Sequence, residues 1–337
     1  CNGRVALSCA AMSVDIHEPH HVVLRGEPFD AIVELGQGWD MEYHQLEAGK
    51  NPSDMIQLRL NGVDVAWERL TRTVLITGSP PPDSITFGLR AMSGEGWGFR
   101  GHEADANTLC LVRPGEELDL RLRGGLLSFV APRETFERRL GSAALRSALF
   151  RDRLRLPADE ADSLRRLGLG ALRAPGAGPE RSGSLGVRED QAQTILTRLE
   201  DVLRRAPEFQ GLPRKPGPRP ARVEAAKKAD EYIRSSLQRH LTVGDFAEAA
   251  DVGERALRSG FRQRFGHGPL AHLRLLRLNA IRRALRAADP GHSVTWVATG
   301  FGIRHLGRFA CHYRELFGET PSETLKSARR RNRSDSG

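Results

Sequence analysis

The sequence has few cysteines and no long apolar run, and each shortage excludes a class of protein. Its four cysteines, Cys1, Cys9, Cys110 and Cys311, lack the paired spacing of a zinc site or a disulfide framework. We therefore expect a reducing cytoplasm, no bound metal and no cofactor. No stretch approaches the ~18 apolar residues of a membrane helix, and the first residues lack a signal-peptide core, so no membrane partner is expected. A lipid-anchored start at Cys1 is the minor alternative.

The charge of the chain is unevenly distributed. The 337 residues carry a net charge of +9, and their 39% apolar and 28% charged content is ordinary for a globular chain of two or three domains. Residues 221–337 hold 22 Lys and Arg against 12 Asp and Glu, whereas the rest of the chain holds 29 against 30. The last third therefore suits a polyanion such as nucleic acid, with solubility as the plainer explanation.

The N-terminal part is predicted to be rich in β-strands. Between residues 22 and 130 apolar side chains alternate with polar ones, as at Val63, Val65 and Trp67, which is typical of short antiparallel strands. Turn signals stand at Asn61-Gly62, Gly78 to Asp83 and Gly124-Gly125. This spacing favours a β-sandwich or a small barrel.

Helical periodicity replaces the alternation from about residue 134 to residue 206. The last segment has one apolar face, which could bind a second copy of the chain or pack on the β-rich domain. That face consists of Ile195, Leu199, Val202 and Leu203. Residues 207–220 are rich in Pro, Gly and basic side chains, as expected of an exposed linker.

Two similar segments near the C-terminus indicate a repeated joint between helices. FGHGPLAHL begins at Phe265 and FGETPSETL begins at Phe317, and both fit the pattern F-G-x-x-P-x-x-x-L. Gly after a helix favours the left-handed C-terminal cap, and Pro is favoured at the first position of the next helix. In the second copy, Thr320 and Glu323 suit a capping box around Pro321.

Each joint ends a unit of two short helices and a tight turn, which is the organisation of a helix-turn-helix. The two units agree at an offset of 51 or 52 residues, with turns at residues 251–253 and at Gly302. The residues expected to face inward are Leu257, Phe261 and Phe265 in the first unit and Leu306, Phe309, Tyr313 and Phe317 in the second. Trp296 is expected in the core as well.

The segment between the two units has the residue content of one linker helix, which Asp289-Pro290-Gly291 would end. About 19 residues at ~1.5 Å per residue span ~28 Å. The linker helix could therefore hold the two second helices about one duplex turn apart, so that both enter successive major-groove segments.

Residues 221–327 resemble the AraC/XylS family of bacterial transcription regulators. The resemblance rests on AEAADVGERALRSGFRQRFGHGPLAHLRLLRLNAIRRAL and on IRHLGRFACHYRELFGETPSETL. It implies double-stranded promoter DNA and RNA polymerase as partners, homodimer formation, and an N-terminal cupin-like barrel that senses a small-molecule effector. The N-terminal part is loosely similar to the subgroup that contains ethanolamine-utilisation regulators, but its effector is not carried over.

By this resemblance, the outward residues of the two recognition helices are expected to contact DNA. They are Arg255, Arg258, Ser259 and Arg262 in the first helix and Arg304, His305, Arg308 and His312 in the second. Arginine can read guanine through two hydrogen bonds, although phosphate contact or a merely solvated face is the alternative for each arginine. Gly253 replaces the family's usual Ser cap, and Gly307 lies inside the second helix, where it weakens helicity.

Other residues could form a metal site or line a cavity, but each has a plainer structural explanation. His17, Glu18, His20 and His21 could bind a metal, but no partner ligands stand nearby in the sequence. Trp39, Tyr43, Trp67 and Trp97 could line a cavity, although an aromatic core is the default. Cys110 suits a core thiol.

The sequence thus predicts an α+β multidomain chain. Its parts are a β-rich cupin-like sensory domain (1–133), a helical dimerisation or linker region (134–206), a flexible linker (207–220), a double helix-turn-helix domain (221–327) and a frayed basic tail (328–337). The predicted function is effector-controlled, sequence-specific transcription regulation, more often activation, at the bacterial nucleoid, without enzymatic activity. The alternatives are a non-specific DNA-binding protein and a DNA-repair enzyme with an attached DNA-binding domain of this type.

Overall fold

The structure is a computed structural model that describes residues 14–16, 21–35, 39–91, 97–173, 184–209, 221–288 and 291–334. The chain divides into two compact units. The sheet unit comprises Val14–Tyr43 and Pro52–Gly217, and the helical unit comprises His44–Asn51 and the chain from Pro218 onward. Within the described ranges no helix is long and apolar enough to cross a membrane.

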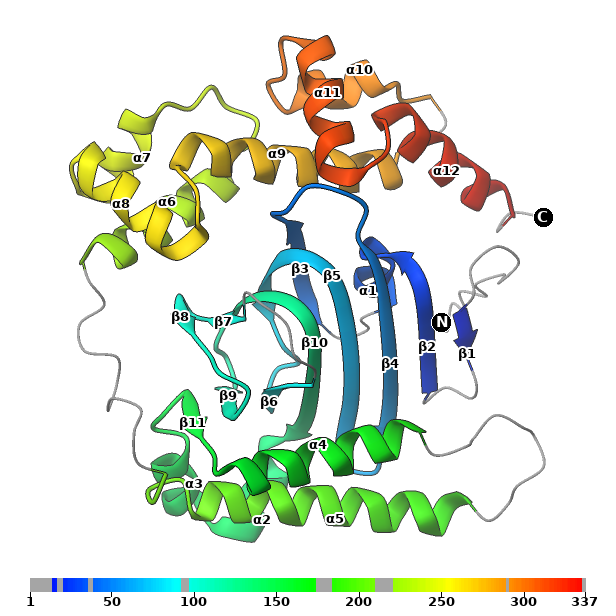
Figure 1. The fold of residues 1–337 in the computed structure, drawn as a ribbon, viewed down its shortest axis with the longest axis vertical. Helices are drawn as coiled ribbons and strands as arrows, with labels where there is room; N and C mark the ends of the chain where they lie inside the picture. The colour runs from blue at the N-terminus through cyan, green and yellow to red at the C-terminus, as the bar shows by residue number, and fades with distance from the viewer. Residues whose placement is uncertain are drawn as a thin grey trace, which may run out of the picture. The chain divides into compact units, whose positions relative to one another are not determined.

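Within the described residues, one antiparallel sheet of eleven strands forms the centre of the sheet unit (Figure 1). Its strands are β1 (Val14–Ile16), β2 (His21–Pro28), β3 (Asp40–Gln45), β4 (Pro52–Leu60), β5 (Val63–Ser79), β6 (Ser84–Arg90), β7 (Gly98–Phe99), β8 (His102–Glu103), β9 (Thr108–Val112), β10 (Leu118–Pro132) and β11 (Arg153–Arg155). The order is β1-β2-β4-β5-β10-β6-β9-β11, with β3 beside β5 and β7 beside β10. The antiparallel β-rich domain is therefore confirmed, while its likeness to a cupin stays a prediction.

Two details of the predicted strand pattern are wrong. Gly124-Gly125 is not a turn, because it lies inside β10, where the pairing with β5 shifts register between Leu122 and Gly124. Gly124 has φ +100°, so glycine permits a bulge that bends the strand without ending it. The region in which helical periodicity was predicted also contains a strand, β11, which pairs with β9.

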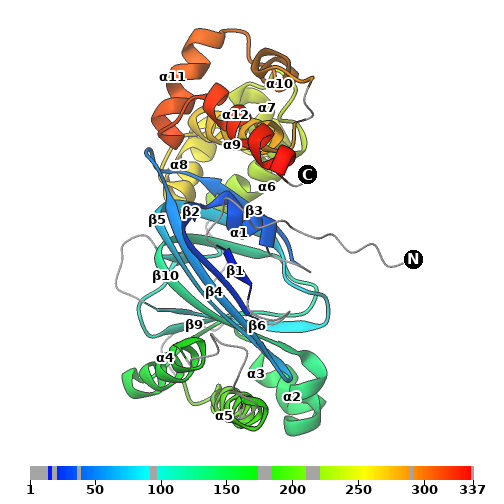
Figure 2. The same cartoon turned by 90° about the vertical axis from the view of Figure 1, so that its right-hand side faces the viewer.

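Among the residues that the structure describes, four helices cover one face of the sheet: α2 (Arg133–Leu140), α3 (Ser142–Ala148), α4 (Ala158–Arg173) and α5 (Ser184–Arg204). Helix α1 (Asp30–Leu35) follows β2. Figures 1 and 2 both show α4 and α5 side by side. Val65 of β5 and Phe129 of β10 share a continuous core with Leu199 of α5. The apolar face of α5 is buried in this core, which supports packing within the unit over dimerisation through that face.

In the described part of the helical unit, seven helices make up most of the chain: α6 (Ala221–Ser235), α7 (Val243–Ala249), α8 (Glu254–Phe265), α9 (Pro269–Arg286), α10 (Val294–Gly300), α11 (Leu306–Phe317) and α12 (Pro321–Ser334). The linker helix α9 packs against α7 and α8 and also against α10 and α12. The tail expected to be frayed from residue 328 is instead the continuation of α12, with Ala328 only 1% exposed. The predicted stop at residues 289–290 lies outside the described residues.

Both predicted joints have the expected caps. Gly266 and Gly318 adopt left-handed φ values of +81° and +69° after α8 and α11. In the second joint, the backbone N–H of Glu323 donates to Thr320 Oγ1 at 3.2 Å, and the N–H of Thr320 donates to Glu323 Oε2 at 2.7 Å. This capping box fixes the start of α12.

The helical unit also contains the segment His44–Asn51, which the sequence did not indicate. The backbone N–H of Gln45 donates to Asn279 Oδ1 at 2.8 Å, and Asn279 Nδ2 donates back to the Gln45 carbonyl at 3.0 Å. The Gln45 side chain donates to the carbonyl of Leu316 at 2.6 Å. The segment therefore contacts both α9 and the end of α11, and it satisfies buried polar groups that would otherwise be costly.

Because α6 lies close to α8, a side chain at Gly260 should lower the stability of the fold. A Cβ added at Gly260 would overlap the carbonyl of Arg222, whereas a Cβ at Gly307 would meet no atom within 4 Å. We expect Gly260→Ala to lower the free energy of unfolding by about 2 kcal/mol through overpacking. Gly307→Ala, the matched control, should leave stability unchanged or raise it by about 0.5–1 kcal/mol through helix propensity. Urea denaturation of both variants measures the difference, and equal stabilities would contradict the packing argument.

Candidate nucleic-acid interface and ligand cavity

The outer face of α8 is basic and exposed because its inner face is held by large apolar side chains. Leu257, Phe261 and Phe265 are at most 5% exposed. The four predicted DNA-contacting residues of this helix, Arg255, Arg258, Ser259 and Arg262, are all exposed, and with Glu254 they line a shallow surface groove. Gly253 caps the helix without a side-chain hydrogen bond, as the sequence indicated.

The second recognition helix, α11, carries fewer of the predicted residues than its sequence suggested. Arg308 is exposed on α11, but Arg304 lies in the turn before it and His305 is its N-cap residue. His312 is only partly exposed, and at the offset of 52 it occupies the position of the buried Gly260. The predicted set is thus divided between the helix face and the preceding turn.

The offset of 52 identifies residues on α11 that the prediction missed. Gly307, Cys311 and Arg314 occupy the positions of Arg255, Ser259 and Arg262 in α8, and all three are exposed. The signal was present in the sequence, because Leu257 and Phe309 already fix this register. Arg262 and Arg314 are therefore the matched basic pair of the two outer faces.

Most of the arginines that were predicted to contact DNA could bind an anionic partner. Arg258 Nη2 donates to Glu254 Oε2 at 2.8 Å, but both side chains are about half exposed, at 47% and 52%, so the pair contributes little stability. Arg255, Arg262 and Arg308 have no ion pair with any described residue. A phosphate would therefore displace few existing interactions at this surface.

Two apolar side chains of the second unit are more exposed than predicted. Trp296 is 61% exposed and stacks on His292, with ring centroids 3.9 Å apart and planes at 2°. The seven-residue α10 buries one narrow stripe, which Val297 and Ala298 fill. Leu306 is 37% exposed because it is the first residue of α11, one turn before the buried Phe309.

A buried polar chain supports the joint between α8 and α9. His272 Nε2 lies 2.6 Å from Asp230 Oδ1, and His272 Nδ1 lies 2.9 Å from His267 Nε2. Burial alone would raise the pKa of Asp230, but Arg234 and His272 hold it well below its usual range. Burial, followed by the proximity of His272, lowers the pKa of His267 to about 4.

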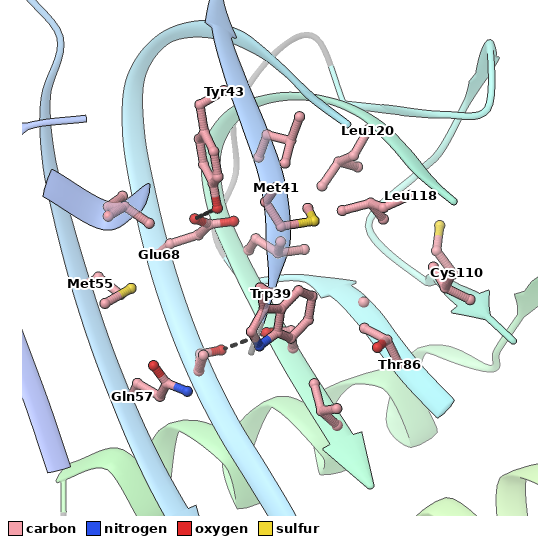
Figure 3. Close-up of a pocket in the computed structure, with 18 of the residues that line it drawn as sticks. Trp39, Met41, Tyr43, Met55, Gln57, Glu68, Thr86, Cys110, Leu118 and Leu120 are labelled. Carbon is pink, nitrogen blue, oxygen red and sulfur yellow. Dashed lines mark hydrogen bonds between the residues drawn. The ribbon is translucent and has the colours of Figure 1, made fainter. Parts of the chain in front are cut away.

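The sheet unit contains a cavity of about 110 Å³ on the sheet face opposite α4 and α5 (Figure 3). Alternate residues of β5 and β10 divide between the two faces, so Val65 and Phe129 enter the core whereas Ala66, Glu68 and Ser128 line the cavity. Trp39, Tyr43 and Trp97 also line the cavity, while Trp67 packs against the core. The cavity interpretation therefore holds for three of these four aromatic residues.

A carboxyl and a phenol meet inside this cavity. Tyr43 Oη donates to Glu68 Oε2 at 3.1 Å, and Figure 3 shows the two side chains pointing toward each other. Burial raises the pKa of Glu68 to about 7, and the Tyr43 hydrogen bond offsets only part of this rise. The Thr86 hydroxyl, also on the cavity wall, has no hydrogen-bond partner among the residues that the structure describes.

No group of three His, Cys, Asp or Glu side chains with the geometry of a metal site occurs in the described ranges. His17, Glu18 and His20, as well as Cys1 and Cys9, lie outside those ranges. Cys110 is buried, and burial raises the pKa of its thiol.

Comparison with known proteins agrees with the paired helix-turn-helix geometry. The family model of a helix-turn-helix domain matches residues 246–327. The probable thc operon regulatory protein of Rhodococcus erythropolis is 36% identical over 111 residues, which are 33% of each chain. The XylDLEGF operon transcriptional activator of Pseudomonas putida is 36% identical over 103 residues, which are 30% of this chain and 32% of the relative. The match thus spans about a third of these curated relatives.

A solved structure of a probable AraC family transcriptional regulator from Rhodopseudomonas palustris is 32% identical, with a TM-score of 0.30, over 31% of this chain and 96% of its own. The fold and these relatives define a double helix-turn-helix domain of a DNA-binding class. Residues 246–327 therefore match a helix-turn-helix family model and are similar to the corresponding part of XylS-type operon regulators.

The polar chain at the α8–α9 joint makes stability depend on pH. The pKa of His267 is lower in the folded chain than in the unfolded chain, so the unfolded chain binds the proton first as pH falls from about 6.5 to about 4. We expect the folded state to lose about 2 kcal/mol of stability at pH 5 relative to pH 7 through this residue. His267→Gln should lose less over the same range. Denaturation at both pH values tests this, and parallel losses in the two proteins would contradict it.

Proposed function

We propose that the chain is a sequence-specific, DNA-binding transcription regulator that a small molecule controls. Its two recognition helices would read promoter DNA, and its sheet unit would bind the effector. The names of the curated relatives favour activation, which would involve contact with RNA polymerase. Action on bacterial DNA would place the protein in the cytoplasm at the nucleoid, and a homodimer would let it bind repeated sites.

The proposal rests mainly on one feature, the same arrangement of exposed and buried residues on both recognition helices. Arg262 of α8 and Arg314 of α11 are exposed at equivalent positions, each opposite a buried stripe at four-residue spacing. The linker helix α9 has 18 residues, so it spans ~27 Å at ~1.5 Å per residue. This length approaches one duplex turn of ~34 Å, as two reading helices on one DNA face require.

The effector part of the proposal rests on the cavity of the sheet unit. A mostly apolar cavity with a few polar groups, one of them a carboxyl with a raised pKa, is the usual form of a small-molecule site. No catalytic group of residues emerges from this arrangement, so the proposal assigns binding and not chemistry to the cavity.

A selection of random duplex DNA by the full chain tests the reading helices. The full chain is required because His44–Asn51 forms part of the helical unit. We expect a bipartite site with halves ~10 base pairs apart. Arg262→Ala should relax sequence preference in one half and Arg314→Ala in the other, each weakening binding to the selected site about 5-fold to 100-fold if the arginine reads a base. Arg255→Ala, Arg258→Ala and Arg308→Ala are the corresponding tests of the other predicted residues.

The matched control is Arg138→Ala, which removes one exposed positive charge from α2 in the sheet unit. It should leave the selected sequence unchanged. If the pool stays random and affinity falls steeply with salt for every variant alike, the chain is a non-specific DNA-binding protein.

Cys311 gives an independent readout of the second helix. Its thiol is exposed on α11, whereas the thiol of Cys110 is buried. The selected DNA should slow alkylation of Cys311 several-fold, because a recognition helix in the major groove is covered by DNA. Peptide mass spectrometry measures each cysteine separately. Unchanged alkylation of Cys311 in a saturated DNA complex would exclude α11 from the interface.

A further inference from the structure

The cavity of the sheet unit has an unusual charge pattern for a small-molecule site. Its ionisable lining residues are Tyr43 on β3, Asp64 and Glu68 on β5, and Cys110 on β9. Among the described residues that line it there is no Lys, Arg or His. Every charge that the described lining side chains can acquire is therefore negative, which disfavours a bound anion.

The two carboxyls have different surroundings. Asp64 lies toward solvent, with 27% of its side chain exposed, and Arg59 donates to its Oδ2 at 3.3 Å. Glu68 is 9% exposed, and the one hydrogen bond it accepts within the described part comes from Tyr43. Its charge therefore lacks a basic partner, so a cation in the cavity would compensate a charge that is otherwise costly to bury.

The aromatic residues of the cavity wall suit the apolar part of an organic cation. Trp39, Tyr43, Trp97 and Phe99 contribute aromatic rings, and ammonium groups bind well against ring faces. The volume of about 110 Å³ is somewhat below the ~150 Å³ of an apolar cavity that admits benzene. A molecule with a single small ring is therefore the upper limit of the expected size. The unpartnered Thr86 hydroxyl offers a further polar contact elsewhere on the cavity wall.

We propose that this cavity binds a small organic ammonium ion with an apolar body, whose charged nitrogen pairs with Glu68 beside Tyr43. The proposal rests on the proposed function in that the bound amine is taken to be the effector. The lining residues on the strands beside β5, Gln57 of β4 and Leu126 and Ser128 of β10, add no charge. Glu68 is thus the residue that selects amines over carboxylates of the same shape.

Calorimetric titration of the full chain with benzylamine, benzyl alcohol and benzoate tests the proposal, because these probes differ mainly in their polar group. At pH 8 we expect benzylamine to bind at least tenfold more tightly than either of the others. Its affinity should fall about tenfold from pH 8 to pH 6, because protonation of Glu68, with a pKa of about 7, removes the negative charge while the amine stays cationic.

Glu68→Gln should weaken benzylamine binding at least tenfold and abolish its pH dependence, while benzyl alcohol binding stays the same and reports an intact cavity. Glu134→Gln is the matched control and should change benzylamine affinity less than threefold, because Glu134 is exposed on α2 and does not line the cavity. If Glu68→Gln does not fold, the probe comparison and the pH comparison on the unaltered chain still decide.

Equal or tighter binding of benzoate or benzyl alcohol, no detectable binding of benzylamine at millimolar concentration, or unchanged binding by folded Glu68→Gln would overturn the assignment. These titrations contain no DNA, so they fail or succeed independently of the DNA selection. Amine binding without sequence-specific DNA binding would leave the ligand site in place and remove the proposed function.

Discussion

The helical unit depends on one constraint, the burial of a large apolar side chain every fourth residue along each recognition helix. Leu257, Phe261 and Phe265 anchor α8, and Phe309, Tyr313 and Phe317 anchor α11. Because an α-helix advances about 100° per residue, burying this stripe leaves the opposite stripe exposed. The positions available for DNA follow from the core, and an error of one residue in the core register would move every outward residue to another face.

The sheet unit obeys the corresponding rule with a period of two. On β5, Val63 and Val65 pack toward the helices, while Ala66 and Glu68 face the cavity. A polar alternate position in a strand usually indicates solvent, so the alternation by itself gives no sign that this face is enclosed. The curvature of the sheet, to which the bulge at Gly124 contributes, encloses that face. Glu68 thereby becomes a buried carboxyl with a raised pKa, although no short motif marks it.

The sequence predictions that were wrong also concern which positions the tertiary structure buries and which it leaves exposed. Trp296 was placed on the buried face together with the aromatic residues of the recognition helices, but the short α10 has room for one buried stripe, which smaller side chains already fill. Arg304 and His305 were placed on the face of α11 because its first residue was set too early, and helix ends are the least certain part of a periodic pattern. The segment 44–51 left no signal, since its contacts with Asn279 and Leu316 join residues more than 200 positions apart.

The sequence by itself determined the local features: the two capped joints, the turn-helix units and their offset, the basic C-terminal third and the alternation of the strands. These depend on residues within a few positions of each other, where dihedral preference and helical or strand periodicity decide. The tertiary structure alone decided which alternate face of β5 is enclosed, that Gly260 must remain small against Arg222, and that Gln45 completes the helical unit. Those features depend on contacts between distant segments, which no local pattern encodes.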